Sequence, residues 1–214
     1  MCAVIGVDCN NSIENINFIN SLFIQSKIRG LHATGISFVE NNKIVTIKES
    51  LSANEFIKRY NIGEIFKNKK RIKLIGHCRY STSDLRFNQP ISDDKLSIVH
   101  NGVVTQELFE NWKNKYGYDC ITQNDSELIF RALKDNNDID IKFKGISFSL
   151  IILNNVGDLT VIRNSLRPLW KAEYDSNIFY ASTKNIFLRS GFSNEIISKV
   201  ESCDNKEKQF RHME

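Results

Sequence analysis

Short apolar segments largely determine what this chain can fold into. They recur between polar turns, and several alternate apolar and polar residues with a period of two, which is typical of β-strands. They form two groups, one in each half of the chain. The expected strands are Met1–Asp8, Gly35–Val39, Lys43–Lys48, Arg71–Cys78 and Lys95–His100 in the first group, and Gly145–Leu153, Asp158–Arg163, Leu169–Tyr174 and Asn177–Ala181 in the second.

Four further segments place apolar residues three and four positions apart, and this spacing predicts helices. They are Ser12–Ile28, Ser52–Tyr60, Thr105–Tyr116 and Asp125–Lys134. The loop Asn154–Gly157 lies between two expected strands and predicts a hairpin. Because strands cluster towards both ends of the chain with helices paired between them, the order favours an α+β fold. We expect two antiparallel sheets faced by helices and not an alternating parallel fold.

Length and composition are those of one soluble globular domain. The 214 residues are 41% hydrophobic and 25% charged, and two prolines with no proline-rich linker give no sign of a boundary. We expect one domain over residues 1–200 and a flexible polar tail over residues 201–214. The net charge of +4 is too small to indicate a nucleic-acid partner. The chain could form homo-oligomers, and its sequence does not decide this.

Cysteine usage points to a reducing compartment. The five cysteines, at positions 2, 9, 78, 120 and 203, are odd in number and include no Cys-x-x-Cys pair. No apolar run approaches the ~20 residues that span a membrane, and the amino terminus lacks the pattern of a secretory leader. We therefore expect a cytoplasmic protein without a membrane partner. The four histidines lack ligand spacing, so no metal site is expected. We also expect no cofactor.

Cys2 can carry unusual chemistry, since removal of Met1 would give one residue both a thiol and a free α-amine. The thiolate is a strong nucleophile, and an amine with a pKa near ~8 can accept the thiol proton at neutral pH. The plainer interpretation is a small buried residue at the start of a strand.

Three other segments have both a chemical and a structural interpretation. Arg79 ends an expected strand, where its guanidinium could bind a carboxylate through two hydrogen bonds or form a weak surface ion pair. Asn101-Gly102 predicts either a type I′ turn or two donors of an oxyanion hole. Asp125 opens a helix, so that Asp125 or Asn124 could be the N-cap, or the Asp125 carboxylate could bind an ammonium group.

Taken together and in this order, these motifs resemble the class II glutamine amidotransferase domain, a member of the amino-terminal nucleophile hydrolases. The resemblance runs from Cys2 to about Gly191, and its type is closest to the amidophosphoribosyltransferases and glutamate synthases. It implies a four-layer α/β/β/α sandwich with two antiparallel sheets and a glutaminase domain over residues 1–200. The matching motifs are Cys2, Arg29-Gly30 with Gly35, Gly76-His77-x-Arg79-Tyr80-Ser81-Thr82, Asn88-Gln89-Pro90, His100-Asn101-Gly102, Asp125-Ser126-Glu127, Arg163 with Leu166-Arg167-Pro168-Leu169, and Ala181-Ser182-Thr183.

The resemblance implies hydrolysis of the side-chain amide of L-glutamine. Cys2 would form a γ-glutamyl thioester, with its own α-amine as base and then as acid. Asn101 and Gly102 would hold the oxyanion. The products would be glutamate and ammonia.

The resemblance also implies which residues bind and support the substrate. Arg79 would bind the α-carboxylate of glutamine with help from Thr82, and Tyr80 belongs to the same binding segment. Asp125 would bind the α-ammonium group. Arg29, Gly30 and His100 would give structural support near the site.

The chain also departs from the family pattern. Some relatives have tryptophan and histidine where this chain has Tyr80 and Gln89, and an aspartate is more usual at the position of His32. No motif of a fused synthase domain is present, so the ammonia acceptor would be a separate partner protein or lie on a portion not included here, if there is one. Two alternatives remain open: a hydrolase for another γ-glutamyl compound or small amide, and a non-catalytic regulatory subunit with the same fold.

Overall fold

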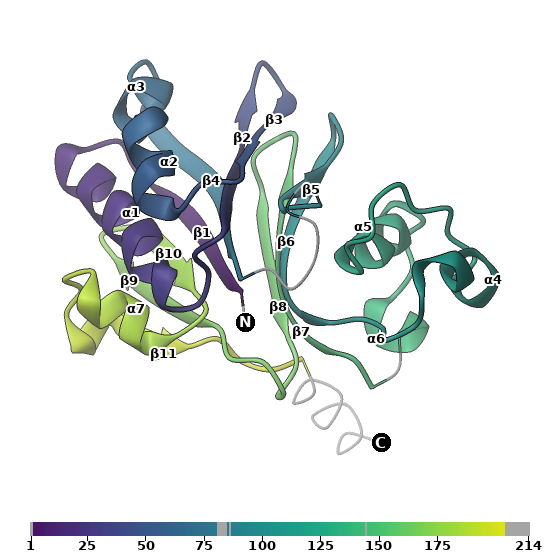
Figure 1. Ribbon diagram of the computed structural model, residues 1–214. Coiled ribbons are helices and arrows are strands. Elements are labelled where there is room, and N and C mark those ends of the chain that lie inside the picture. The colour runs from purple at the N-terminus through teal and green to yellow at the C-terminus, as the bar shows by residue number, and fades with distance from the viewer. Residues whose placement is uncertain (1, 81–84, 86, 144, 204–214) are drawn as a thin grey trace.

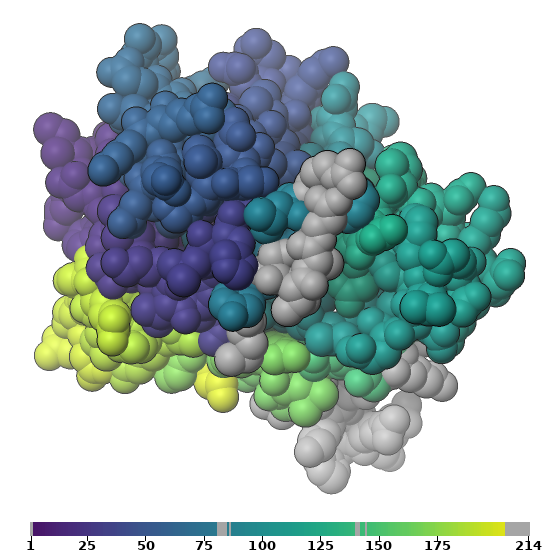
Figure 2. Space-filling model, viewed as in Figure 1, coloured from purple at the N-terminus to yellow at the C-terminus, as the bar shows by residue number. Residues whose placement is uncertain are grey.

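Two antiparallel sheets stack face to face, and helices cover the outer face of each (Figure 1). The computed structural model describes residues 2–80, 85, 87–143 and 145–203. The predicted α+β architecture, a four-layer α/β/β/α sandwich with two antiparallel sheets, is confirmed. In the space-filling view, the early part of the chain (purple and blue) lies on the left, and the segment around residues 100–130 (teal) lies on the right (Figure 2).

The larger sheet has seven strands within the described residues, in the order β11-β9-β10-β1-β4-β2-β3. Strands β1 and β4 lie at its centre and pair along their whole length, from Ala3 opposite Cys78 to Asn10 opposite Arg71. The strand bounds are β1 Ala3–Asn10, β2 Ala33–Glu40, β3 Lys43–Glu49, β4 Arg71–Arg79, β9 Trp170–Tyr174, β10 Asn177–Ala181 and β11 Ile197–Lys199.

The smaller sheet has four strands within the described residues, in the order β5-β6-β7-β8. The expected hairpin at Asn154–Gly157 is confirmed, because it joins the antiparallel strands β7 and β8. The strand bounds are β5 Ile91–Ser92, β6 Leu96–Val103, β7 Ser147–Asn154 and β8 Leu159–Arg163.

Helices form the two outer layers, four of them over the larger sheet and three beside the smaller one within the described residues (Figure 1). Local capping explains where two of them begin: the Ser12 side chain accepts from the Asn15 amide before α1, and Ser52 and Glu55 form a capping box at α2. The bounds are α1 Ile13–Gln25, α2 Ala53–Arg59, α3 Ile62–Phe66 and α7 Lys184–Arg189 on one side, and α4 Trp112–Tyr116, α5 Ser126–Lys134 and α6 Ile139–Lys142 on the other.

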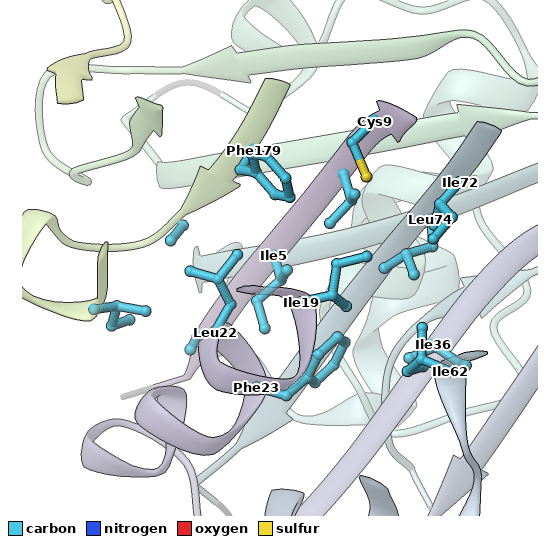
Figure 3. Close-up of a cluster of buried hydrophobic side chains, with 14 of the residues drawn as sticks. Ile5, Cys9, Ile19, Leu22, Phe23, Ile36, Ile62, Ile72, Leu74 and Phe179 are labelled. Atoms are coloured by element: carbon cyan, nitrogen blue, oxygen red, sulfur yellow. The ribbon is translucent and has the colours of Figure 1, made fainter. Parts of the chain in front are cut away.

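Each interface between layers contains its own apolar cluster. Helix α1 presents Ile19, Leu22 and Phe23 to the larger sheet, where Ile5 lies beneath them (Figure 3). A Cβ atom on Gly76 would lie 2.3 Å from the Phe23 ring, so this glycine makes room for the largest side chain of the contact. The other two clusters lie between the sheets and between the smaller sheet and α5.

One expectation about local structure is wrong, and one of two open alternatives is excluded. The predicted helix Thr105–Tyr116 is helical only from Phe109, as a 3₁₀ turn over Phe109–Asn111 followed by α4, because side chains bind the preceding backbone amides. Asn101-Gly102 does not form a type I′ turn. It lies inside β6, which stays paired with β7 as far as Val103. The short elements α3, α6, α7, β5 and β11 were not expected from the sequence.

Residues 201–203 of the expected tail contact the domain. Ser202 is buried, and the Cys203 amide donates to the Arg163 carbonyl at 2.9 Å. Residues 204–214 lie outside the described residues, so their flexibility stays a prediction. Helices in the described part of the chain are too short and too polar to cross a membrane.

Candidate active site

A cavity of about 420 Å³ collects most of the expected site residues. Its walls come from the ends of β1 and β4, from β6, and from the segment that leads into α5. Thr82 lies outside the described residues, and Arg29 and Gly30 are not among the residues that line the cavity. The expected site residues that line the cavity are Cys2, Arg79, Tyr80, His100, Asn101, Gly102 and Asp125.

Cys2 directly precedes β1 and is partly exposed to the cavity. Because Ala3 pairs with Cys78, the antiparallel register places Cys2 beside Arg79 at the end of β4. The Cys2 thiol approaches the Tyr80 carbonyl oxygen at 4.0 Å. The thiol therefore lies at the strand ends, in the same cavity as Arg79, the residue expected to bind substrate.

Arg29 holds the backbone of Cys2, since its Nε atom donates to the Cys2 carbonyl at 2.9 Å. Burial lowers the pKa of Arg29, and the nearby Cys2 partly opposes this effect. The adjacent Gly30 packs against β4 so closely that a Cβ atom would lie 2.2 Å from the Cys78 carbonyl oxygen. Only glycine fits there, and the close packing places Arg29 against Cys2.

Three other cysteines are poor nucleophiles. Burial raises the pKa of Cys9 and Cys78 to about 12 and that of Cys120 to about 11. These thiols therefore stay protonated at neutral pH, where the thiolate is the reactive form.

Asn101 offers a hydrogen-bond donor to the cavity. Its side chain is only 3% exposed, and its Nδ2 atom has no partner among the described residues. A buried unpaired amide is costly unless a ligand satisfies it. The arrangement suits a group that would accept a hydrogen bond within the cavity.

The Gly102 backbone N–H also faces away from β7. Gly102 is paired with Phe148, whose own N–H and C=O bond Asn164 on the opposite side. Gly102 and Phe148 are thus a pair without mutual hydrogen bonds, so the Gly102 N–H points to the open edge of β6. A Cβ atom on Gly102 would lie 1.8 Å from the Ser147 carbonyl oxygen, which leaves no room for a side chain.

Arg79 ends β4 with its side chain only 7% exposed. Its guanidinium donates to the Phe87 carbonyl, which also accepts from the Asn124 side chain at 3.0 Å. Tyr80 follows Arg79 and is half exposed, with its ring 4.9 Å from that of His32. His32, the unusual residue of the Arg29 turn, therefore contacts the expected binding segment.

Asp125 uses one carboxylate oxygen to hold the end of β6. Its Oδ2 atom accepts from the amides of Val104 at 2.7 Å and Thr105 at 3.4 Å. The Asp125 side chain does not cap α5. Asn124 does so instead, since its Oδ1 atom accepts from the Ser126 amide at 3.1 Å. The same Asp125 carboxylate lines the cavity.

A buried polar network, to which sequence reasoning assigned no role, surrounds His100. The Gln89 side chain bonds both backbone groups of His100, and Ser126 Oγ lies 2.8 Å from the His100 ring. Burial lowers the pKa of His77 to about 3 and that of His100 to about 4, so both histidines are neutral at pH 7. The Asn-Gln-Pro motif belongs to the family pattern, but the contact of Gln89 with His100 depends on strand register.

Arg167 is a second cavity residue without an expected role. Its Nε atom donates to Ser147 Oγ at 3.0 Å. Buried Arg163 holds the preceding turn by donating to the carbonyls of Asn164 at 2.8 Å and Arg167 at 3.0 Å. Both arginines belong to the family motif that begins at Arg163 and ends at Leu169, and this motif is the sequence signal that points to them. Within the described residues, no three His, Cys, Asp or Glu side chains gather as a metal site would require.

A family model described as a glutamine amidotransferase domain matches residues 77–189, more than half of the chain. The chain belongs to the glutamine amidotransferase domain family. The matched segment contains Arg79, Asn101, Gly102 and Asp125, while Cys2 and Arg29 precede it. A comparison with curated proteins found no match.

Solved structures show the fold of this glutamine amidotransferase domain over nearly all of its length. One is the glutamine phosphoribosylpyrophosphate amidotransferase of B. subtilis, with a TM-score of 0.65 at 18% identity over 94% of this chain. Another, described as the allosteric regulatory enzyme of purine biosynthesis, has a TM-score of 0.62 at 19% identity over 94% of this chain. The domain covers 49% of each of these longer chains. The expected membership of the glutamine amidotransferase domains is thus confirmed, and the two solved structures show the same fold.

Proposed function

We propose that this domain hydrolyses the side-chain amide of L-glutamine and supplies the ammonia to an acceptor outside the domain. One observation carries the proposal: a single cavity is lined by a thiol, two amide donors, a guanidinium and a carboxylate, from Cys2, Asn101, Gly102, Arg79 and Asp125. These residues come from distant parts of the sequence, and each has a chemical counterpart in bound glutamine.

The two ends of a free amino acid match Arg79 and Asp125. The Arg79 guanidinium binds the α-carboxylate through its planar fork, and the Asp125 carboxylate binds the α-ammonium group. Tyr80 forms part of the cavity wall. The role expected for Thr82 stays a prediction, because Thr82 lies outside the described residues. This pair of opposite charges favours glutamine over amides that lack a free amino-acid end.

The reaction begins once Met1 has been removed and the Cys2 α-amine is free. The amine takes the thiol proton, and the sulfur attacks the amide carbon of glutamine. Asn101 Nδ2 and the Gly102 N–H stabilise the oxyanion, and donors of this kind contribute roughly 3 kcal/mol each to lowering the barrier. The carbon–nitrogen bond then breaks, the α-ammonium returns its proton to the leaving nitrogen, and ammonia and a γ-glutamyl thioester remain.

Water completes the cycle. The amine accepts a proton from a water molecule as the water oxygen attacks the thioester carbon. The carbon–sulfur bond then breaks, and the α-ammonium returns the proton to sulfur, which gives glutamate and the Cys2 thiol. Arg29 supports this chemistry by fixing the Cys2 carbonyl, and the His100 ring by its contact with Ser126 Oγ beside the strand that carries Asn101. A reducing compartment such as the cytoplasm keeps the thiol reactive.

The ammonia acceptor belongs elsewhere in this proposal. The glutaminase fold accounts for the residues that the structure describes, whereas the two solved relatives are about twice as long. We therefore assign the acceptor to a partner protein or to another part of a longer polypeptide.

Intact mass after incubation with a diazoketone analogue of L-glutamine tests the proposal. The thiolate would displace dinitrogen from the protonated reagent and form one stable thioether. We expect one adduct on protein that lacks Met1, absent from Cys2→Ala and retained in the matched variant Cys120→Ala. Retention of Met1, or an adduct that survives Cys2→Ala, would refute the assignment of Cys2 as nucleophile.

A further inference from the structure

Strand β6 has an open hydrogen-bonding edge beside the cavity, because its neighbour β5 is very short. Strand β5 pairs with β6 only at Ile91 opposite Ile98 and Ser92 opposite Ser97. Continued backwards, this register would place Gln89 opposite His100. The chain forms no strand at residues 87–90, so β6 lacks a backbone partner at that point.

The Gln89 side chain takes the place of the missing strand. Its Oε1 atom accepts from the His100 N–H at 2.6 Å, and its Nε2 atom donates to the His100 carbonyl at 3.1 Å. These are the two bonds that a strand residue would exchange with His100. Nε2 also donates to Ser126 Oγ at 3.1 Å, and Gln89 is only 4% exposed.

A second side chain holds the same edge two positions beyond Gly102. Because N–H groups alternate along a strand, His100, Gly102 and Val104 direct theirs to the same side. The Val104 N–H is bound by Asp125 Oδ2 at 2.7 Å. The Gly102 N–H therefore lies between two anchored amides and opens onto the cavity.

Gln89 is itself fixed by the larger sheet. A Cβ atom on Gly35 of β2 would lie 2.3 Å from the Gln89 carbonyl oxygen, so this glycine permits close packing. Lys48 of β3 donates to the Asn88 carbonyl at 3.2 Å. Gln89 thus connects the larger sheet, against which its backbone packs, to the open edge of β6 in the smaller sheet, which its side chain bonds.

We propose that Gln89 is a positioning residue for the Gly102 oxyanion donor, a role that rests on the proposed glutaminase function. The position requires a side chain that donates and accepts at once, which an amide provides and a carboxylate or thioether does not. Gln89 lines the cavity, but both polar atoms of its side chain are already bonded within the protein, so it acts through His100 and the strand. Its loss would lower the rate of the chemical step more than it weakens glutamine binding.

Steady-state kinetics of Gln89→Met test this role, with Gln25→Met on α1 as the matched control. We expect kcat for glutamine hydrolysis to fall about 10- to 100-fold, as displacements of a catalytic group by about an ångström do, while KM changes less than about threefold. Amide hydrogen exchange at His100 should become faster in Gln89→Met only. An unchanged kcat, or an equal loss in Gln25→Met, would overturn the proposal.

The variant Gln89→Glu separates positioning from mere folding. A protonated glutamic acid can both donate and accept, whereas its carboxylate can only accept. We expect the kcat ratio of Gln89→Glu to wild type to fall as the pH rises through the pKa of the new carboxyl group. A ratio that does not depend on pH would count against positioning by hydrogen bonding. If Gln89→Met does not fold, the pH dependence of kcat in Gln89→Glu still tests the positioning role.

Failure of the proposed function would look different. Wild-type protein that lacks Met1 but releases no Cys2-dependent glutamate would refute glutaminase activity. Amide hydrogen exchange at His100 would still show whether Gln89 holds β6. Equal exchange rates in Gln89→Met and Gln25→Met would refute the positioning role of Gln89, whatever the activity of the protein.

Discussion

The Nε atom of Arg29 donates a hydrogen bond to the backbone carbonyl of Cys2 at 2.9 Å. This bond engages the backbone of Cys2 and leaves its side chain at the cavity. The contact fixes the residue expected to be the nucleophile without engaging its sulfur. Gly30 makes the contact possible, since any side chain there would collide with the Cys78 carbonyl. The turn and the strand end thus act as one rigid support.

We predict that Cys2→Ser reduces glutamate release at least about 100-fold, because an alcohol is far harder to deprotonate than a thiol. Release of glutamate from glutamine measures the effect. Cys120→Ser is the control and should retain activity, since burial keeps that thiol protonated. Activity of Cys2→Ser close to wild type would exclude Cys2 as the nucleophile.

We predict that Arg79→Lys raises the KM for glutamine about tenfold and lowers kcat less, because lysine lacks the bidentate fork. The exposed Arg59 pairs weakly with Glu49, so Arg59→Lys is the matched control and should change neither constant. Initial rates over a range of glutamine concentrations give both values. An unchanged KM in Arg79→Lys would place the carboxylate site elsewhere.

We predict that Gly102→Ala lowers the free energy of unfolding by about 1–3 kcal/mol, the usual cost of overpacking, and also slows turnover. The cause is the Ser147 carbonyl oxygen, which would lie 1.8 Å from the new Cβ atom. Gly63→Ala in helix α3 has more room and should be near neutral. Urea unfolding compares the two variants, and equal stabilities would contradict the packing argument.

We predict that the buried histidines make the fold less stable in mild acid. The pKa of His77 is lowered to about 3 and that of His100 to about 4, both below the ordinary value of 6.5. The unfolded chain therefore binds more protons as the pH falls below about 6.5. The free energy of unfolding drops by up to about 1.4 kcal/mol per pH unit for each histidine down to its folded pKa.

Urea unfolding between pH 4.5 and 7 measures this loss. His77→Gln should show a weaker pH dependence than wild type. Identical slopes in His77→Gln and wild type would mean that His77 titrates alike in the folded and unfolded chains.

Local patterns predicted the sheets better than the site. The period of two identified β1 and β4 because one face of each strand packs under α1, as Ile5 and Leu74 do. The helix expected from Thr105 does not begin there, because the Asp125 carboxylate binds the amides of Val104 and Thr105. That contact joins residues far apart in sequence, and no local window contains it.

The site residues were recognised from their types and order, while their contacts were not. Asn101-Gly102 has the strongest local signal for a hairpin turn, yet pairing with β7 carries the strand through it. Gln89 meets His100 only because β5 stops short. Arg167 reaches Ser147 from a turn that Arg163 holds by backbone carbonyls. Such contacts depend on the register of several strands at once.

The carboxylate of Asp125 has a consequence for substrate selection. One carboxylate oxygen of Asp125 already accepts from the Val104 amide at the end of β6. In the proposed function, the same carboxylate also binds the α-ammonium group of glutamine. An occupied ammonium site would fix that carboxylate and so stiffen the strand that carries Gly102. Binding of the α-ammonium group would thereby raise the rate at which the side-chain amide reacts. A substrate without an α-amino group would then have a lower kcat as well as a weaker affinity.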